Sequence, residues 1–182
     1  MKKFQKKETK KNNKGFTLLE TMIAIFVISV GLVGVAAIIF QIFASASISS
    51  NNLIASYLTQ EGIEIVRSVR DGNWLEERTS ANLWNEGLTV CGATGFIVDY
   101  NHSYGPNQID PVFPCYNNQF LNIDANGFYS YASGSLTRFQ RRITIFEGPI
   151  IGQSINVRVE IFWSERGRNH RFESQANLYN WR

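Results

Sequence analysis

The chain has 182 residues, a formal net charge of +3 and 44% hydrophobic residues. It contains no internal repeat and no linker long enough to separate two domains, which favours one globular domain besides the N-terminal segment. A phosphate-binding glycine loop, a nucleophile motif and paired histidines are all missing, so neither an enzyme nor a cofactor-binding protein is indicated. The two cysteines and two histidines have no metal-ligand spacing, which argues against a metal site.

The first 15 residues are rich in lysine. They hold seven lysines and one glutamate, so the other 167 residues carry a net charge of −3. A basic segment directly before an apolar one stays in the cytoplasm, because positive charge is retained on that side of the membrane. Everything after the apolar segment is therefore expected to be exported.

An apolar run follows this basic leader. From Met22 to Phe40, Ser29 is the only polar residue among 19. At 1.5 Å per residue a helix of that length spans roughly 28 Å, about the thickness of the hydrocarbon core of a bilayer. The run predicts a membrane-spanning helix, which we place at residues 16–43.

The processing signal lies before this helix. A secretory signal peptide has a shorter apolar stretch with a small-residue cleavage site after it, whereas here the candidate junction is Gly15-Phe16. Cleavage at this junction would keep the helix. Glu20 lies in the first turn, where a carboxylate that cannot reach water costs up to about 3 kcal/mol and so needs a partner. The alternative is that Glu20 is solvated at the cytoplasmic interface.

This combination of a Gly-Phe junction, a glutamate inside an apolar run and a basic leader resembles the N-terminus of type IV pilins and pseudopilins. The resemblance implies that a dedicated membrane peptidase cuts after Gly15 and that Phe16 becomes N-methylated. It also implies that Glu20 is used in assembly, by meeting the N-terminal amine of a neighbouring subunit. Many major pilins carry a proline within the apolar helix, whereas all four prolines of this chain lie at position 106 or later.

The helix is expected to continue beyond the membrane. Its apolar residues recur at three- and four-residue spacing, and Asp71-Gly72 is expected to end it. These residues are Leu53, Ile54, Tyr57, Leu58, Ile65, Val66 and Val69.

The C-terminal third alternates with a two-residue period. Three antiparallel strands are expected, at residues 139–147, 155–164 and 171–179, with short strands at 96–100 and 128–131. The predicted fold is α+β and type IV pilin-like, with a long N-terminal helix packed against an antiparallel sheet of about three to five strands. The expected domains are a leader at 1–15, the transmembrane and assembly helix at 16–43, and an exported head at 44–182 that includes the second half of the helix.

Two further features lie in the irregular region between helix and sheet, residues 72–135. A disulfide between Cys91 and Cys115 would stabilise the head by about 3.5 kcal/mol, and two reduced, buried thiols are the alternative. Asp124 and Asn126 stand before Gly127 in a pattern similar to the first part of a calcium loop. No acidic residue completes such a loop, so a tight turn is favoured.

Charge is distributed unevenly along the chain. Residues 136–182 hold eight arginines against four glutamates, a net charge of +4, whereas residues 16–135 have a net charge of −7. A solvated strand face, docking between subunits and DNA capture are three interpretations, and DNA capture is the least favoured. The arginines assigned to these surfaces are Arg138, Arg141, Arg142, Arg166, Arg168 and Arg171.

Three functions are open from the sequence. The favoured one is a pilin, minor rather than major, in a type IV pilus that serves adhesion, motility or DNA uptake. The second is a pseudopilin of a type II secretion system, and the third is a plain membrane-anchored binding module. The first two imply a single-pass protein of the cytoplasmic membrane that later joins an extracellular pilus or a periplasmic pseudopilus. Its partners would be other pilin subunits, the prepilin peptidase and methyltransferase, the inner-membrane assembly platform, and membrane lipid before assembly.

Overall fold

The computed structural model describes residues 15–75, 84–89, 91–101 and 113–180. The lysine-rich leader up to residue 14 lies outside these residues. The chain divides into two compact units, Met1–Ile48 and Ser49–Arg182, and each is described by itself. One helix, α1 (Leu18–Leu75), contributes residues to both.

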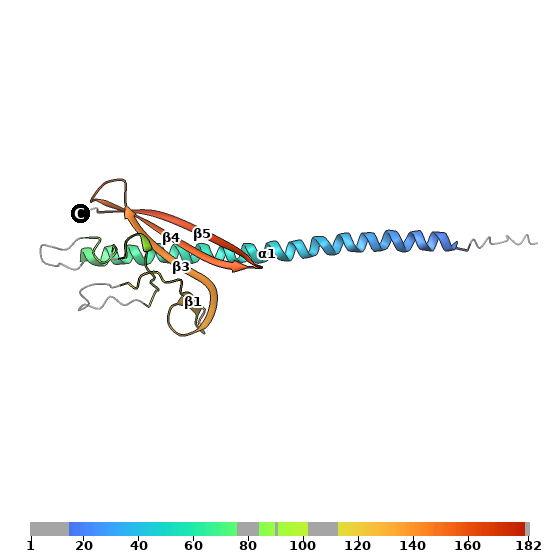
Figure 1. Ribbon diagram of the computed structural model, residues 1–182, viewed down its shortest axis with the longest axis horizontal. Helices are drawn as coiled ribbons and strands as arrows, with labels where there is room; N and C mark the ends of the chain where they lie inside the picture. The colour runs from blue at the N-terminus through green and yellow to red at the C-terminus, as the bar shows by residue number, and fades with distance from the viewer. Residues whose placement is uncertain (1–14, 76–83, 90, 102–112, 181–182) are drawn as a thin grey trace, which may run out of the picture. The chain divides into compact units, whose positions relative to one another are not determined.

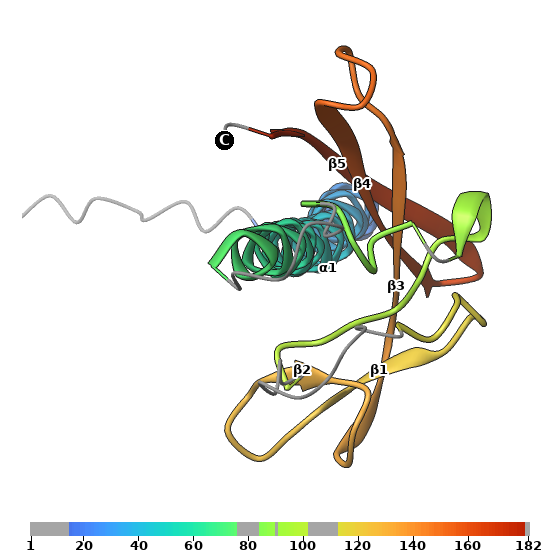
Figure 2. The same cartoon turned by 90° about the vertical axis from the view of Figure 1, so that its left-hand side faces the viewer.

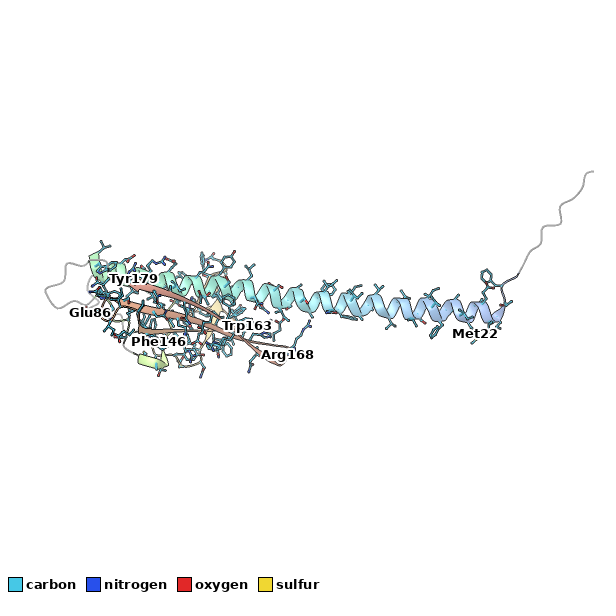
Figure 3. All side chains as sticks on the ribbon, turned by 90° about the horizontal axis from the view of Figure 1, so that it is seen from above. Met22, Glu86, Phe146, Trp163, Arg168 and Tyr179 are labelled. Atoms are coloured by element: carbon cyan, nitrogen blue, oxygen red, sulfur yellow. A yellow bond between two sulfur atoms is a disulfide. The ribbon has the colours of Figure 1, made fainter. Side chains whose placement is uncertain are left out.

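In the first unit, α1 is exposed on every side. All residues from Gly15 to Phe43 are exposed, and Figure 3 shows the side chains around Met22 projecting outward from the helix. Within the part of the chain that the structure describes, α1 is the one helix long and apolar enough to cross a membrane, with a mean hydropathy of 2.9 over its best window. The hydroxyls of Thr21 and Ser29 donate to the carbonyls of Leu18 and Phe26, both at 2.8 Å. These polar groups therefore need no partner outside the helix.

In the second unit, the C-terminal half of α1 packs against a five-stranded antiparallel sheet, which confirms the predicted fold class. Figure 1 shows β3, β4 and β5 beside the teal and green part of α1. Figure 2 looks along the helix and shows β5 at one end of the sheet and β1 and β2 at the other, in agreement with the order β2-β1-β3-β4-β5. The strands are β1 (Phe120–Ile123), β2 (Tyr129–Ser130), β3 (Ser135–Glu147), β4 (Ser154–Glu165) and β5 (Arg168–Tyr179).

The face of α1 that packs on the sheet is built around small residues. Ala55 is fully buried, and a Cβ atom at Gly62 would lie 2.9 Å from Cγ1 of Val159. Close approach of helix and sheet therefore depends on the missing side chain at Gly62. The predicted apolar stripe was wrong at Leu53 and Tyr57, which are exposed, because the small residues and not the largest ones define the contact.

The helix also ends later than predicted. It continues past Asp71-Gly72 to Leu75, since Trp74 is buried and the guanidinium of Arg70 lies 4.7 Å from its ring. The side chain of Asn73 donates to the carbonyls of Trp84 and Glu86, both at 3.1 Å. Tertiary contacts of the last turn outweigh the helix-ending tendency of Asp-Gly in the sequence.

The three long strands confirm the two-residue period. Register pairs such as Ile143 with Val159 and Val157 with Ala176 place alternate side chains on the helix-facing side. Val157, Val159 and Ile161 are fully buried there and form the core with α1. Each strand begins earlier than predicted, β3 by four residues.

The irregular region was predicted less well. The strand expected at 96–100 is reduced to bridges from Phe96 to Cys115 and to Ile143, and β1 was not predicted at all. The strand at 128–131 is the two-residue β2, which pairs with β1. Phe96 exchanges two backbone hydrogen bonds with Ile143, at 2.8 and 3.0 Å, so this segment is attached to β3 without forming a ladder.

The assignment of Arg141 to a docking or DNA-binding surface was wrong. Its side chain has 0% exposure, and its guanidinium donates to the backbone carbonyls of Leu58 on α1 and Val98 in the irregular segment. Glu61 Oε1 lies 3.3 Å from Arg141 Nη1. Position 141 falls on the helix-facing side of β3, where a long cation is retained only with acceptors of this kind.

A second contact stabilises the same region. The hydroxyl of Tyr131 donates to the backbone carbonyl of Arg141 at 3.2 Å, and Asp99 Oδ2 accepts the backbone N–H of Tyr131 at 2.6 Å. Burial raises the pKa of Tyr131 to about 12, so its phenol stays protonated and keeps donating at neutral pH.

The two cysteines lie at disulfide distance. Their sulfur atoms are 2.09 Å apart and their Cα atoms 5.5 Å apart. Cys91 immediately precedes the short 3-10 helix η1 (Gly92–Thr94), and Cys115 bridges Phe96. The pair therefore closes a loop within the irregular region.

We expect Arg141→Met to lower the free energy of unfolding of the head by about 3 kcal/mol, because two backbone carbonyls lose their buried donor and Glu61 loses its ion-pair partner. The matched control is Arg67→Met, which breaks an exposed pair with Glu64 and should cost under about 0.5 kcal/mol. All four tryptophans lie beyond residue 73, so tryptophan fluorescence during urea unfolding of the chain in detergent reports on the head alone. Equal unfolding curves for the two variants would contradict this role of Arg141.

We expect Cys91 and Cys115 to resist alkylation in freshly exported protein until a reductant is added. Replacing either by serine should then lower the stability of the head by roughly 2 to 4 kcal/mol. Mass spectrometry after alkylation, with and without reductant, makes the measurement. Complete alkylation of both thiols in native protein would show that the bond does not form.

Candidate processing and assembly site

The candidate cleavage junction lies just outside the helix. Gly15 and Phe16 precede α1, which begins at Leu18, and both are exposed. No atom beyond its chain neighbours lies within 4 Å of a Cβ built at Gly15, and Phe16 is 78% exposed. The Gly15-Phe16 peptide bond is therefore accessible in this structure and is not held by helical hydrogen bonds.

Thr17 positions the beginning of the helix. Its Oγ1 accepts the backbone N–H of Glu20 at 3.3 Å, and its carbonyl accepts the N–H of Thr21 at 3.2 Å. Thr17 is thus the N-cap of the helix, and Glu20 occupies the N3 position. The sequence analysis did not identify Thr17, although the spacing to Glu20 is the signal that would have found it.

The sequence around Glu20 provides no side-chain cation. The helix macrodipole stabilises negative charge in the first turn. Between Lys14 and Arg67 the sequence contains no lysine, arginine or histidine. If residues 1–15 are removed, the only cationic group of the chain before Arg67 is the new α-amine of Phe16. Within a processed chain, this α-amine is therefore the cation closest in sequence to Glu20.

Asp124 belongs to a turn, as favoured from the sequence. The N–H of Gly127 donates to the carbonyl of Asp124 at 3.2 Å, and Oδ1 of Asp124 accepts the N–H groups of Asn126 at 2.8 Å and Phe128 at 2.9 Å. These hydrogen bonds, the one from Phe128 above all, lower the pKa of the Asp124 carboxyl. Oδ1 is thereby engaged in closing the hairpin between β1 and β2.

Two of the C-terminal arginines are paired within the head. Glu160 is almost fully buried, and its carboxylate accepts from Arg142 at 2.6 Å and from Arg171 at 2.8 Å. Arg171 also pairs with Glu173. For Arg142 and Arg171, internal pairing accounts for much of the charge that the sequence assigned to a docking surface.

Comparison with known proteins identifies the N-terminal segment. Residues 10–36 match the family model for the prokaryotic N-terminal methylation motif, which is the type IV pilin or prepilin-type cleavage motif. Neither the search of curated proteins nor that of solved structures gave a match. The matched residues include the Gly15-Phe16 junction, Glu20 and the first part of the apolar run. The chain therefore carries the prepilin-type cleavage motif, which supports a type IV pilin-like or pseudopilin protein, a structural subunit with an N-terminal apolar helix fit for membrane anchoring.

Proposed function

We propose that the protein is a minor pilin of a type IV pilus. In this proposal the leader 1–15 is removed, Phe16 becomes the methylated N-terminus, and Glu20 sets the register of the subunit in the fibre. The observation that carries the proposal is the methylation motif at residues 10–36, which lies directly on an apolar helix with an exposed junction before it.

Pairing between neighbouring subunits follows from electrostatics. A carboxylate in an apolar helix bundle loses its hydration, and opposite charges attract more strongly in low dielectric than in water. Because the chain has no lysine, arginine or histidine between Lys14 and Arg67, the partner of Glu20 is an N-terminal amine. One axial offset between parallel helices brings the amine of one chain to Glu20 of the next, and other offsets leave the carboxylate unpaired.

The absence of proline between Phe16 and Phe40 favours a minor over a major subunit, since many major pilins carry a proline there. A pseudopilin of a type II secretion system is the second candidate, because the same motif and helix serve in both assemblies. A membrane-anchored binding module would leave the motif without a role.

Processing is expected to produce a mature chain that begins at Phe16 with a methylated amine. Gly15→Arg should block cleavage, because the exposed junction then carries a large, charged side chain in place of none. The control is Asn13→Arg, which adds the same charge to the leader but leaves the junction intact. Mass spectrometry of protein isolated from membranes determines the N-terminus of both variants and its methylation. An uncleaved leader in assembled wild-type fibres, or equal cleavage of the two variants, would overturn the proposal.

Glu20→Ala should leave insertion and cleavage intact, since removing a charge favours insertion, and should reduce incorporation into fibres at least about tenfold for a lost pair worth about 1.4 kcal/mol or more. Glu64→Ala, which removes a carboxylate paired with Arg67 on the exposed side of α1, is the control. Both are expressed in a deletion strain together with tagged wild type, and surface fibres and secreted enzymes are measured in parallel.

Loss of fibres in the deletion strain supports the proposal of a pilin. Loss of secreted enzymes with normal fibres supports a pseudopilin instead. Equal incorporation of the Glu20 and Glu64 variants would exclude pairing through Glu20. Normal fibres and normal secretion in the deletion strain would leave the membrane-anchored binding module as the remaining candidate function.

A further inference from the structure

A cavity of about 460 Å³ opens on the face of the sheet that turns away from α1. Its floor includes Phe162 and Gln140, which are register partners on β4 and β3, together with Arg142. Because side chains alternate along a strand, these three point away from the helix-facing core that contains Ile161. The labelled Trp163 in Figure 3 marks the adjacent position on β4.

The wall of the cavity is fixed to its floor. Tyr116 and Asn118, from the segment before β1, line it. The Gln140 side-chain amide donates to the carbonyl of Asn118 at 2.7 Å, and the ring centroids of Tyr116 and Phe162 are 6.4 Å apart. Asn118 adopts a left-handed backbone conformation with φ of 62°, which asparagine tolerates better than most residues. The site is therefore largely formed before any ligand binds.

The lining of the cavity is basic, although both of its arginines have a carboxylate within 4.0 Å, Glu160 for Arg142 and Glu165 for Arg138. None of the described residues that line it carries a carboxylate, and its two formal charges are Arg138 and Arg142. Arg142 is held in place, since its guanidinium lies 5.5 Å from the Tyr116 ring centroid and 5.3 Å from that of Phe162 while its Nε donates to Glu160 at 2.7 Å.

Arg138 is the more available of the two. Its side chain is 52% exposed, and its ion pair with Glu165 is long, with 4.0 Å between Nη1 and Oε1, beyond hydrogen-bond distance. The other oxygen of Glu165 accepts the side-chain amide of Asn51 at 2.8 Å. Arg138 thus presents donors at the cavity for an anionic group of a ligand.

The remaining lining groups define the rest of the ligand. Asn169 can both donate and accept hydrogen bonds, and the hydroxyl of Ser164, which donates to the carbonyl of Arg168 at 3.4 Å, can still accept them, which suits hydroxyl groups. Phe120, 40% exposed, adds an apolar surface. A ligand with one carboxylate, several hydroxyls and an apolar ring face matches this set, and the volume lies within the range of small-molecule sites.

We infer that this cavity binds an acidic sugar, with Arg138 on the carboxylate and Asn169 and Ser164 on hydroxyls. The inference goes beyond the proposed function and does not depend on it. Single-stranded nucleic acid fits less well, because each of the Tyr116 and Phe162 rings has the Arg142 guanidinium within 5.5 Å, which limits base stacking. Outside the cavity, Arg158 and Arg171 are each paired with Glu173, so their guanidinium groups are less available to bind the phosphates of a nucleic acid.

The test uses the full processed chain in detergent and two probes, a disaccharide ending in a hexuronic acid and the same disaccharide with that carboxylate reduced to the alcohol. Ligand-observed NMR titration at physiological ionic strength measures the affinity of the protein for each disaccharide. The acid should bind saturably and at least about tenfold more tightly than the reduced form, the range of one charge-assisted hydrogen bond. Oligothymidylate serves as a competitor.

Three variants locate the binding. Arg138→Gln should weaken binding of the acid about tenfold. Asn169→Asp keeps the shape of the side chain and adds a negative charge, so it should weaken the acid similarly and leave the reduced disaccharide unchanged. Arg158→Gln removes the same charge from the same sheet face outside the cavity and should change the affinity for neither disaccharide. Circular dichroism checks the fold, and Asn169→Asp decides the matter if Arg138→Gln is unfolded.

The inference is overturned if the acid does not saturate, if acid and reduced sugar bind equally, or if Arg138→Gln and Arg158→Gln have equal effects. Displacement of the sugar by oligothymidylate that binds more tightly, and that also loses affinity in Arg138→Gln, would show a nucleic-acid site instead.

Discussion

The buried guanidinium of Arg141 is the contact on which the architecture of the head depends. It reaches from β3 to the carbonyl of Leu58 on α1 and to that of Val98 in the irregular segment. A buried cation requires its acceptors, so helix, sheet and segment are held in one arrangement. The described residues 91–101 are attached to β3 through the isolated bridge at Phe96 and not through a ladder, so the contact of Arg141 with Val98 adds to their attachment. The same segment leads to Tyr116, so the wall of the cavity on the opposite sheet face also depends on it.

Polar and apolar groups are arranged in opposite ways in the two units. In the head, polar groups such as Arg141 and Glu160 are buried and paired, and they determine where segments lie. In the N-terminal unit the apolar side chains are exposed, and the hydroxyls of Thr21 and Ser29 are satisfied within the helix. Glu20 is therefore the one formally charged side chain from Gly15 to Gln60, and specificity in this unit is concentrated at its carboxylate.

The sequence predicted best what depends on periodicity. The apolar run, the long helix and the alternation in β3, β4 and β5 each extend over ten residues or more, and the turn at Asp124 has a local signal. Features that depend on contacts between distant segments of the chain were predicted poorly from the sequence. Nothing local shows that Arg141 is buried, since its neighbour Arg142 has the same charge and differs only in which sheet face it occupies. The Glu160 pairs and the cavity likewise require the register between β3 and β4 and the position of the segment before β1. Thr17 was a local signal that was overlooked.

The internal hydrogen bonds of Thr21 and Ser29 have a consequence for the energetics of leaving a bilayer. A helix whose polar groups are already satisfied presents nearly the same solvation requirement to lipid tails as to other apolar helices, because the two surroundings are about equally apolar. Transfer between them then changes the free energy little along most of the helix, and small differences determine its direction. For such a helix, the solvation of its polar groups favours neither lipid nor a bundle of like helices.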